Sequence, residues 1–258
     1  MSSLRTVHVT RYVTPLREGG SLPAIIEADD DGLYVLKFRG AGQGPRALIA
    51  ELVSGELARA LGLPVPEVVF VDLDADLART EPDPEIQELI RASAGLNLAL
   101  DYLPGSVAFD PVADRVDSTL ASEVVWFDAF TANVDRTARN TNLLMWHRRL
   151  WLIDHGASLY FHHGTPAAEF VLRADDAFPR ISEHVLLGRA SAIGEADMRL
   201  TPRLSDEVID GVTGHIPDAW LGEGAEAQRT AYADYLRARV RGARSFMEEA
   251  TRARLSRV

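Results

Sequence analysis

Cysteine is absent from the 258 residues of this sequence. That absence excludes a disulfide framework and a thiolate metal site, so any bound metal would have oxygen or imidazole ligands. No apolar run reaches the roughly 18 residues that a membrane-spanning helix requires. The N-terminal residues also lack the apolar stretch of a secretory signal. These absences predict a cytoplasmic protein with no membrane among its partners.

Positive charge is scarce, and lysine is almost missing. The 38 acidic residues outnumber the 27 basic ones and give a formal net charge of −11, which argues against binding to nucleic acid or to an acidic membrane surface. Of the basic residues 26 are arginine, and Lys37 is the single lysine. A solvated surface position rarely requires lysine, whereas a site that needs a compact, flexible point charge does. Lys37 is therefore a candidate functional residue, with chance survival of one lysine as the alternative.

The first half of the sequence is rich in predicted strands. Apolar residues at helical spacing predict one main helix at 46–61, with Gly62 as its stop. A short helix is expected at 85–92. Alternating and β-branched runs predict strands at 6–13, 24–28, 33–39, 68–73 and 97–102.

Beyond Gly105 the pattern becomes mainly helical. This change of character predicts an N-terminal lobe at 1–103 and a C-terminal lobe at 104–258. The expected C-terminal elements are an apolar helix at 119–132 capped by Ser118, two strands at 141–146 and 150–153 joined by a tight turn, and a final amphipathic helix at 224–254.

Three polar residues around the predicted hairpin form the most informative constellation. The apolar helix leads into a loop that holds Asp135 and, five residues later, Asn140. The hairpin then returns the chain to Asp154, so that Asn140 and Asp154 can direct their oxygens to one point. Amide and carboxylate oxygens suit Mg²⁺, which keeps substrate phosphates and waters as its other ligands. Asp135 would lie nearby, able to orient or deprotonate an attacking hydroxyl.

This spacing resembles the kinase catalytic loop, in which an Asp is followed five residues later by a metal-binding Asn and then by an Asp-Phe-Gly element. Here the last element is Asp154-His155-Gly156, and the loop has the form Asp-Arg-x-x-x-Asn, which is similar to HipA-like and phosphoinositide kinases. Thr137 stands where those branches often have His. The resemblance spans about residues 12–161. It implies an α+β, two-lobed protein-kinase-like fold, with an antiparallel N-terminal sheet plus a helix and a mainly helical C-terminal lobe.

The resemblance also implies the residues that bind ATP. Lys37, in Val35-Leu36-Lys37, matches the lysine that contacts the α- and β-phosphates. Its acidic partner is expected on the following helix, where Glu51 is preferred and Glu56 is the alternative, interpreted as a solvated helix residue. The flexible glycine loop and the inter-lobe hinge would supply the remaining contacts, from Gly19, Gly20, Ser21, Leu100, Asp101 and Tyr102.

The function implied is transfer of the ATP γ-phosphoryl group to a hydroxyl, with ATP and Mg²⁺ as cofactors. A HipA-like resemblance favours a protein serine or threonine as acceptor, whereas the phosphoinositide-like form permits a lipid or a small molecule. A nucleotide-binding pseudokinase with a regulatory role is a further alternative. No metal or base residue of the motif is missing, which argues against that alternative.

Overall fold

The N-terminal part of the chain forms a five-stranded closed barrel in the computed structural model, which describes residues 4–16 and 22–257. The strand order is β1-β2-β3-β5-β4, and only the β1–β4 pair is parallel. Inward-facing residues such as Ile26, Leu36 and Val71 fill the barrel. The strands are β1 (Thr6–Pro15), β2 (Ala24–Ala28), β3 (Leu33–Lys37), β4 (Val68–Leu73) and β5 (Gly95–Asp101).

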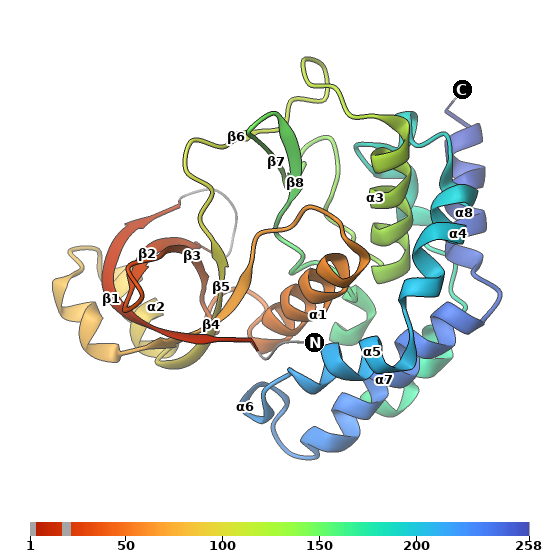
Figure 1. Cartoon of the computed structure of the whole chain (residues 1–258). Helices are drawn as coiled ribbons and strands as arrows, with labels where there is room; N and C mark the ends of the chain where they lie inside the picture. Colours follow the sequence, from red (N-terminus) through yellow and green to blue (C-terminus); the bar gives the residue numbers. More distant parts are fainter. Residues whose placement is uncertain (1–3, 17–21, 258) are drawn as a thin grey trace.

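Helix α1 (Pro45–Leu61) lies between the barrel and the helical part of the molecule (Figure 1). Pro45 occupies its first turn, where a missing N–H is harmless, and Gly62 ends it in the left-handed conformation with φ 79°, as predicted. The helix is buried around most of its circumference because it packs on β4 and β5 and on α5 and α6. Acidic residues on such a helix are therefore buried as well.

A second, three-stranded sheet stands between the barrel and the helices. Its strands are β6 (Val107–Ala108), β7 (Leu143–Trp146) and β8 (Arg149–Leu152). His147 and Arg148 form the β7–β8 turn, both at positive φ (48° and 63°), which is the arrangement that suits the twist of a two-residue hairpin. The Leu152 N–H donates to the Pro64 carbonyl at 2.8 Å, so the hairpin is joined to the segment that follows α1.

The C-terminal part is mainly helical, in agreement with the prediction. Its α-helices are α3 (Ser118–Thr131), α4 (Ile193–Leu200), α5 (Asp206–Gly214), α6 (Asp218–Leu221), α7 (Ala225–Arg241) and α8 (Ser245–Leu255), and α2 (Pro84–Ala92) belongs to the N-terminal part. Short 3₁₀ helices occur at Ala75–Thr80, Tyr160–His163, Ala167–Arg173, Pro179–Glu183, Leu187–Arg189 and Thr201–Arg203. Within residues 4–16 and 22–257, the structure contains no helix with the length and apolarity needed to span a membrane.

Two predicted helix boundaries are wrong. Asp117, not Ser118, caps α3, and its carboxylate accepts the N–H groups of Thr119 and Leu120. The final helix is two helices, because the chain leaves α7 at Gly242. A side chain at Gly242 would come within 2.9 Å of the Ala238 carbonyl and would collide with Asp175.

Candidate active site

The single lysine lies at the end of β3, paired with Asp154. Its Nζ is 2.8 Å from Asp154 Oδ1, with the lysine side chain 10% exposed and that of Asp154 39% exposed. Burial lowers the pKa of Lys37, but Asp154 and Glu51 together raise it above its ordinary value. Burial likewise opposes ionisation of Asp154, while Lys37 brings the pKa of that carboxyl below its usual range. Asp154 has φ 54°, a strained conformation for a residue with a side chain.

Glu51 of α1 lies near Lys37 and Asp154 but forms no ion pair with a described residue. Its side chain is 1% exposed, and Oε1 has no hydrogen-bond partner among the described residues. A Cβ at Gly156 would lie 3.6 Å from Glu51 Oε2 and 3.7 Å from Asp154 Oδ1, so the two carboxylates flank that glycine. Burial raises the pKa of Glu51 to about 7, against the attraction of Lys37. Native proteins rarely leave a buried polar atom without a hydrogen-bond partner. The unsatisfied Oε1 of Glu51 is therefore a place to which the nearby ammonium of Lys37 could move.

Glu56 lies elsewhere and is not a solvated residue, so that interpretation is wrong. It is fully buried, and Arg59 donates from Nε to Glu56 Oε1 at 2.9 Å and pairs with Oε2 as well. The reason is the packing of α1, which is covered on most sides and leaves no solvated face for this position.

Asp135 and Asn140 meet directly in the loop that follows α3. Asn140 Nδ2 donates to Asp135 Oδ2 at 2.7 Å, and Asn142 Nδ2 donates to the same oxygen at 3.3 Å. Asp135 Oδ1 accepts from no described residue, so one carboxylate oxygen stays available. The Ile153 N–H donates to the Asn142 carbonyl at 3.1 Å and holds the two ends of the hairpin segment together.

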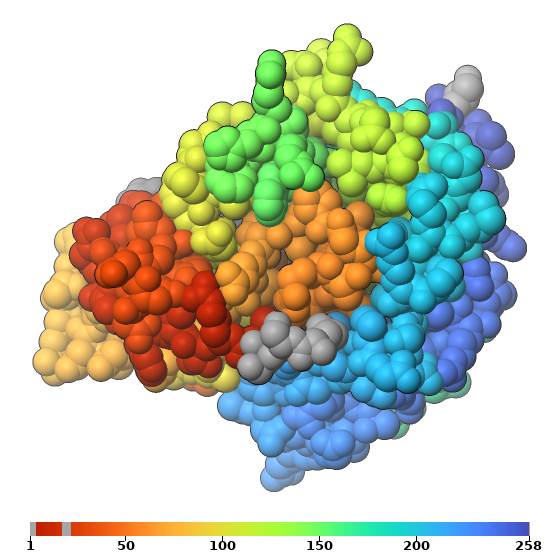
Figure 2. All heavy atoms as spheres, in the orientation of Figure 1, coloured from red at the N-terminus to blue at the C-terminus, as the bar shows by residue number. Residues whose placement is uncertain are grey.

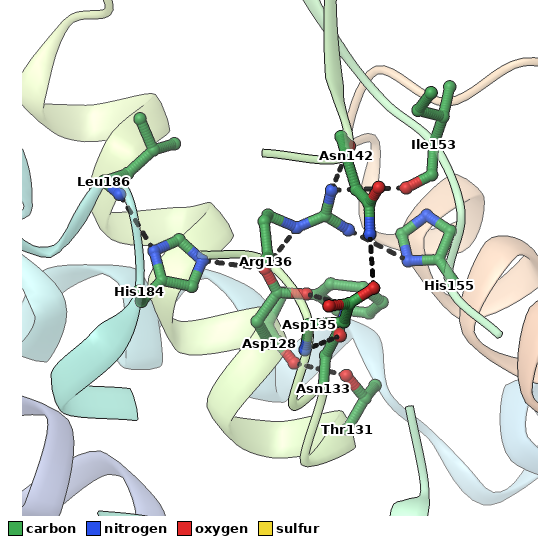
Figure 3. A network of polar contacts seen from close by, with 11 residues as sticks. Asp128, Thr131, Asn133, Asp135, Arg136, Asn142, Ile153, His155, His184 and Leu186 are labelled. Carbon is green, nitrogen blue, oxygen red and sulfur yellow. Dashed lines mark hydrogen bonds and ion pairs between the residues drawn. The ribbon is translucent and has the colours of Figure 1, made fainter. Parts of the chain in front are cut away.

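Beneath this loop lies a buried polar network that the sequence did not reveal (Figure 3). Asp128 of α3 is fully buried and accepts from Arg136 Nε at 2.6 Å, His184 Nε2 at 2.8 Å and Asn133 Nδ2 at 3.2 Å. Burial opposes the charge on Asp128, yet Arg136 and His184 hold the pKa of its carboxyl well below the usual range. An Asp in the buried second half of a mainly apolar helix, eight residues before an Arg, was the available signal.

Arg136 joins the loop that follows α3 to the loop that holds Asp154. Besides Asp128, it donates to the carbonyl oxygens of Asn142 and Ile153 and contacts His155 Nδ1 at 3.3 Å. Burial lowers the pKa of His155 to about 3, with the neighbouring guanidinium acting in the same direction. His155 is therefore a neutral packing residue behind Asp154, and the planar fork of Arg136 fixes the spacing of the two loops.

The predicted hinge residues lie at the end of β5, with part of their backbone already engaged. Leu100 is buried, the Asp101 N–H donates to the Glu67 carbonyl at 2.8 Å, and the Tyr102 N–H donates to the Leu33 carbonyl at 3.0 Å. The next N–H, that of Leu103, donates to no residue among those described. Gly19, Gly20 and Ser21, predicted to form the glycine loop, fall outside the described residues.

The oxygens of Asn140 and Asp154 fit a hard divalent cation in their chemistry. The exposed Asn140 uses its Nδ2 as a donor to Asp135, which leaves its amide oxygen without a described partner, and Asp154 is partly exposed. In the part of the chain that the structure describes, no group of three or more His, Cys, Asp or Glu side chains is arranged to hold a metal. A metal here would thus have two protein ligands and would rely on phosphate and water for the rest, the arrangement typical of Mg²⁺.

Known proteins resemble this chain in sequence family and in fold. A family model described as HipA-like kinase matches residues 9–246, whereas none of the curated protein sequences matches significantly. The Helicobacter pylori proinflammatory kinase CtkA is similar at 12% identity and a TM-score of 0.59, over 97% of this chain and 99% of that one. The Golgi casein kinase with Mn/ADP bound is similar at 10% identity and a TM-score of 0.50, over 100% and 74%. These likenesses confirm the predicted protein-kinase-like fold.

Proposed function

The chain belongs to the HipA-like kinase family, as its loop residues predicted, and from this premise we propose that it transfers the γ-phosphoryl group of ATP to a hydroxyl. A protein serine or threonine is the acceptor that this family favours. The observation that carries the proposal is the 2.8 Å pair of Lys37 and Asp154 beside the unsatisfied carboxylate of Glu51. The Mn/ADP bound to the similar Golgi casein kinase supports a nucleotide and a divalent cation as the ligands.

The proposed mechanism rests on positioning and on charge, as phosphoryl transfer generally does. Lys37 would bind the ATP phosphates, with Glu51 as the second acidic group that attracts its ammonium. Asn140 and Asp154 would hold Mg²⁺, which when bound would neutralise the charge of the phosphates. Asp135 would accept the hydrogen of the acceptor hydroxyl at Oδ1, since its Oδ2 is occupied by two amide donors. The N–H of Leu103 is the free hinge donor for the adenine ring.

Labelled ATP tests the proposal directly. The unaltered chain is incubated with γ-³²P-ATP and Mg²⁺, with and without cell extract, beside Lys37→Ala, Asp154→Asn and the control Asp234→Asn, an exposed residue of α7. We expect transfer to fall at least ~100-fold in the first two variants and to be unchanged in the control. Circular dichroism establishes that each variant is folded.

The destination of the label separates the possible acceptors. Phosphoserine or phosphothreonine on this chain or on an extract protein supports the protein-kinase assignment, whereas label in a lipid or a small molecule identifies another kinase class. Full transfer by Asp154→Asn would refute the proposed metal ligand. ATP binding by the unaltered chain without any transfer would favour a nucleotide-binding regulatory module.

A further inference from the structure

Arginine side chains without a partner are unusual in this acidic protein. Most guanidinium groups in residues 4–16 and 22–257 bind a carboxylate or a carbonyl oxygen. Within that part of the chain, the exceptions are Arg115, Arg139, Arg148, Arg149 and Arg254, whose guanidinium groups have no hydrogen bond or ion pair to a described residue. Arg139 belongs to the loop that follows α3, and Arg254 belongs to α8, but the other three occur together.

Arg115, Arg148 and Arg149 line one surface cavity of about 550 Å³. The cavity lies between the end of α1, the start of α3 and the β7–β8 hairpin. In Figure 2 the green hairpin and the yellow-green segment before α3 rise as separate ridges, with orange atoms of α1 below them. Neither Lys37 nor Asp154 lines it, so the cavity is separate from the candidate active site.

A second hollow of about 440 Å³ continues the first along the segment before α3. The two share Arg115, Val116 and Asp117, and the second adds Val112, Asp114 and Arg189. Val112 is 93% exposed, an unusual degree of exposure for an apolar side chain beside a cavity. The two hollows adjoin through these shared residues, so an occupant that fills both is longer than a compact ion.

The walls of the first cavity combine charge with apolar surface. Leu63, Leu120 and Met145 lie among the arginines, so an aliphatic side chain could be buried there. Asp117 also lines the cavity and already occupies the N–H groups at the start of α3. A doubly charged phosphate would concentrate its charge near this carboxylate, whereas carboxylates spread along a peptide can each pair with a different arginine.

The geometry points to a docking site for an acidic polypeptide segment that carries leucine or a similar aliphatic residue. The partner's carboxylates pair with Arg115, Arg148 and Arg149, and its aliphatic side chain packs on Leu63 and Leu120. Because the chain has a net charge of −11, such a partner is repelled at long range, and this local positive patch determines where it binds. The site does not depend on phosphoryl transfer.

The probe is a short fluorescein-labelled peptide of glutamates interspersed with leucines, titrated with the full chain and followed by fluorescence anisotropy. The test variant is Arg148→Glu/Arg149→Glu. The matched control is Arg11→Glu/Arg79→Glu, which makes the same charge change at exposed positions that are already paired. We expect the affinity to fall at least ~10-fold more in the test variant than in the control, and to weaken between about 0.05 and 0.5 M salt. Both variants should melt within about 2 °C of the unaltered chain.

Three outcomes would overturn the inference. The first is equal affinity of the test and control variants. The second is equal binding of a peptide with lysine in place of glutamate, and the third is displacement of the probe by inorganic phosphate alone at millimolar concentration, which would indicate a small-anion site. Since the readout is binding without ATP, a failure here leaves the proposed phosphoryl transfer untouched, and a failure of that transfer leaves this site untouched.

Discussion

Replacing Asp128 by asparagine tests how strongly the buried network supports the loops of the candidate active site. The change keeps the shape of the side chain but removes the charge that neutralises Arg136. The NH₂ group of the new asparagine would also face at least one of the groups that now donate a hydrogen bond to Asp128. Breaking a buried ion pair by removing one partner is destabilising by about 3–5 kcal/mol. Total stabilities are about 5–15 kcal/mol, so we expect the midpoint of urea unfolding to fall by about 1 M or more.

The assay is equilibrium urea unfolding at pH 7, followed by tryptophan fluorescence. Asp234→Asn is the control, since Asp234 forms an exposed ion pair with Arg237 at 2.9 Å. This substitution should change the free energy of unfolding by less than about 0.5 kcal/mol. Because Asp128 has a lowered pKa in the folded state, the stability that its charge contributes is fully present above the unfolded-state pKa of about 3.9. This stability declines as the pH falls below that value. A loss below about 1 kcal/mol at pH 7 would refute the reasoning.

The remaining predictions concern Glu51 and the end of α3. Because Glu51 has a pKa raised to about 7, the unliganded protein loses stability as the pH rises from its unfolded value through 7. Relative to the unaltered chain, Glu51→Gln should therefore raise the free energy of unfolding by up to about 3 kcal/mol more at pH 8 than at pH 5, as measured by urea unfolding. An equal increase at the two pH values would contradict this. Ala132 caps α3 at φ 52°, so Ala132→Gly should stabilise by roughly 0.5 kcal/mol, whereas Ala129→Gly inside the helix should destabilise by about 1 kcal/mol; the same sign for both would contradict the cap assignment.

The elements of the N-terminal part could be predicted because their signals are local. Alternation marks the strands, and Gly62 marks the end of α1 in the sequence itself. Closure of the barrel could not be predicted, since it depends on the parallel pairing of β1 with β4, through residues such as Thr6 and Phe70. Nothing within either strand specifies that distant partner.

The misplaced boundaries have the same origin in distant contacts. Periodicity continues across Gly242 because both flanking helices are amphipathic, whereas the contacts at the break are made with Asp175, which is far away in the chain. Asp117 and Ser118 are both capping residue types, so composition alone could not choose between them. The buried role of Asp128 depends on His184, which arrives from a segment more than fifty residues later.

Under the proposed function, the different geometries of the two kinds of cation in the molecule give a reason for a lysine at position 37. Burial does not in itself require lysine here, because Arg136 and Arg239 are also buried and use several donors at once to hold carbonyl oxygens in place. A guanidinium fork of that kind is fixed by its own geometry. Lys37 instead presents a single charge between Asp154, at 2.8 Å, and Glu51, whose Oε1 is unsatisfied. A compact ammonium can leave one carboxylate for the other, or for a phosphate, without rebuilding a set of bonds, and that exchange is what the proposed transfer demands of position 37.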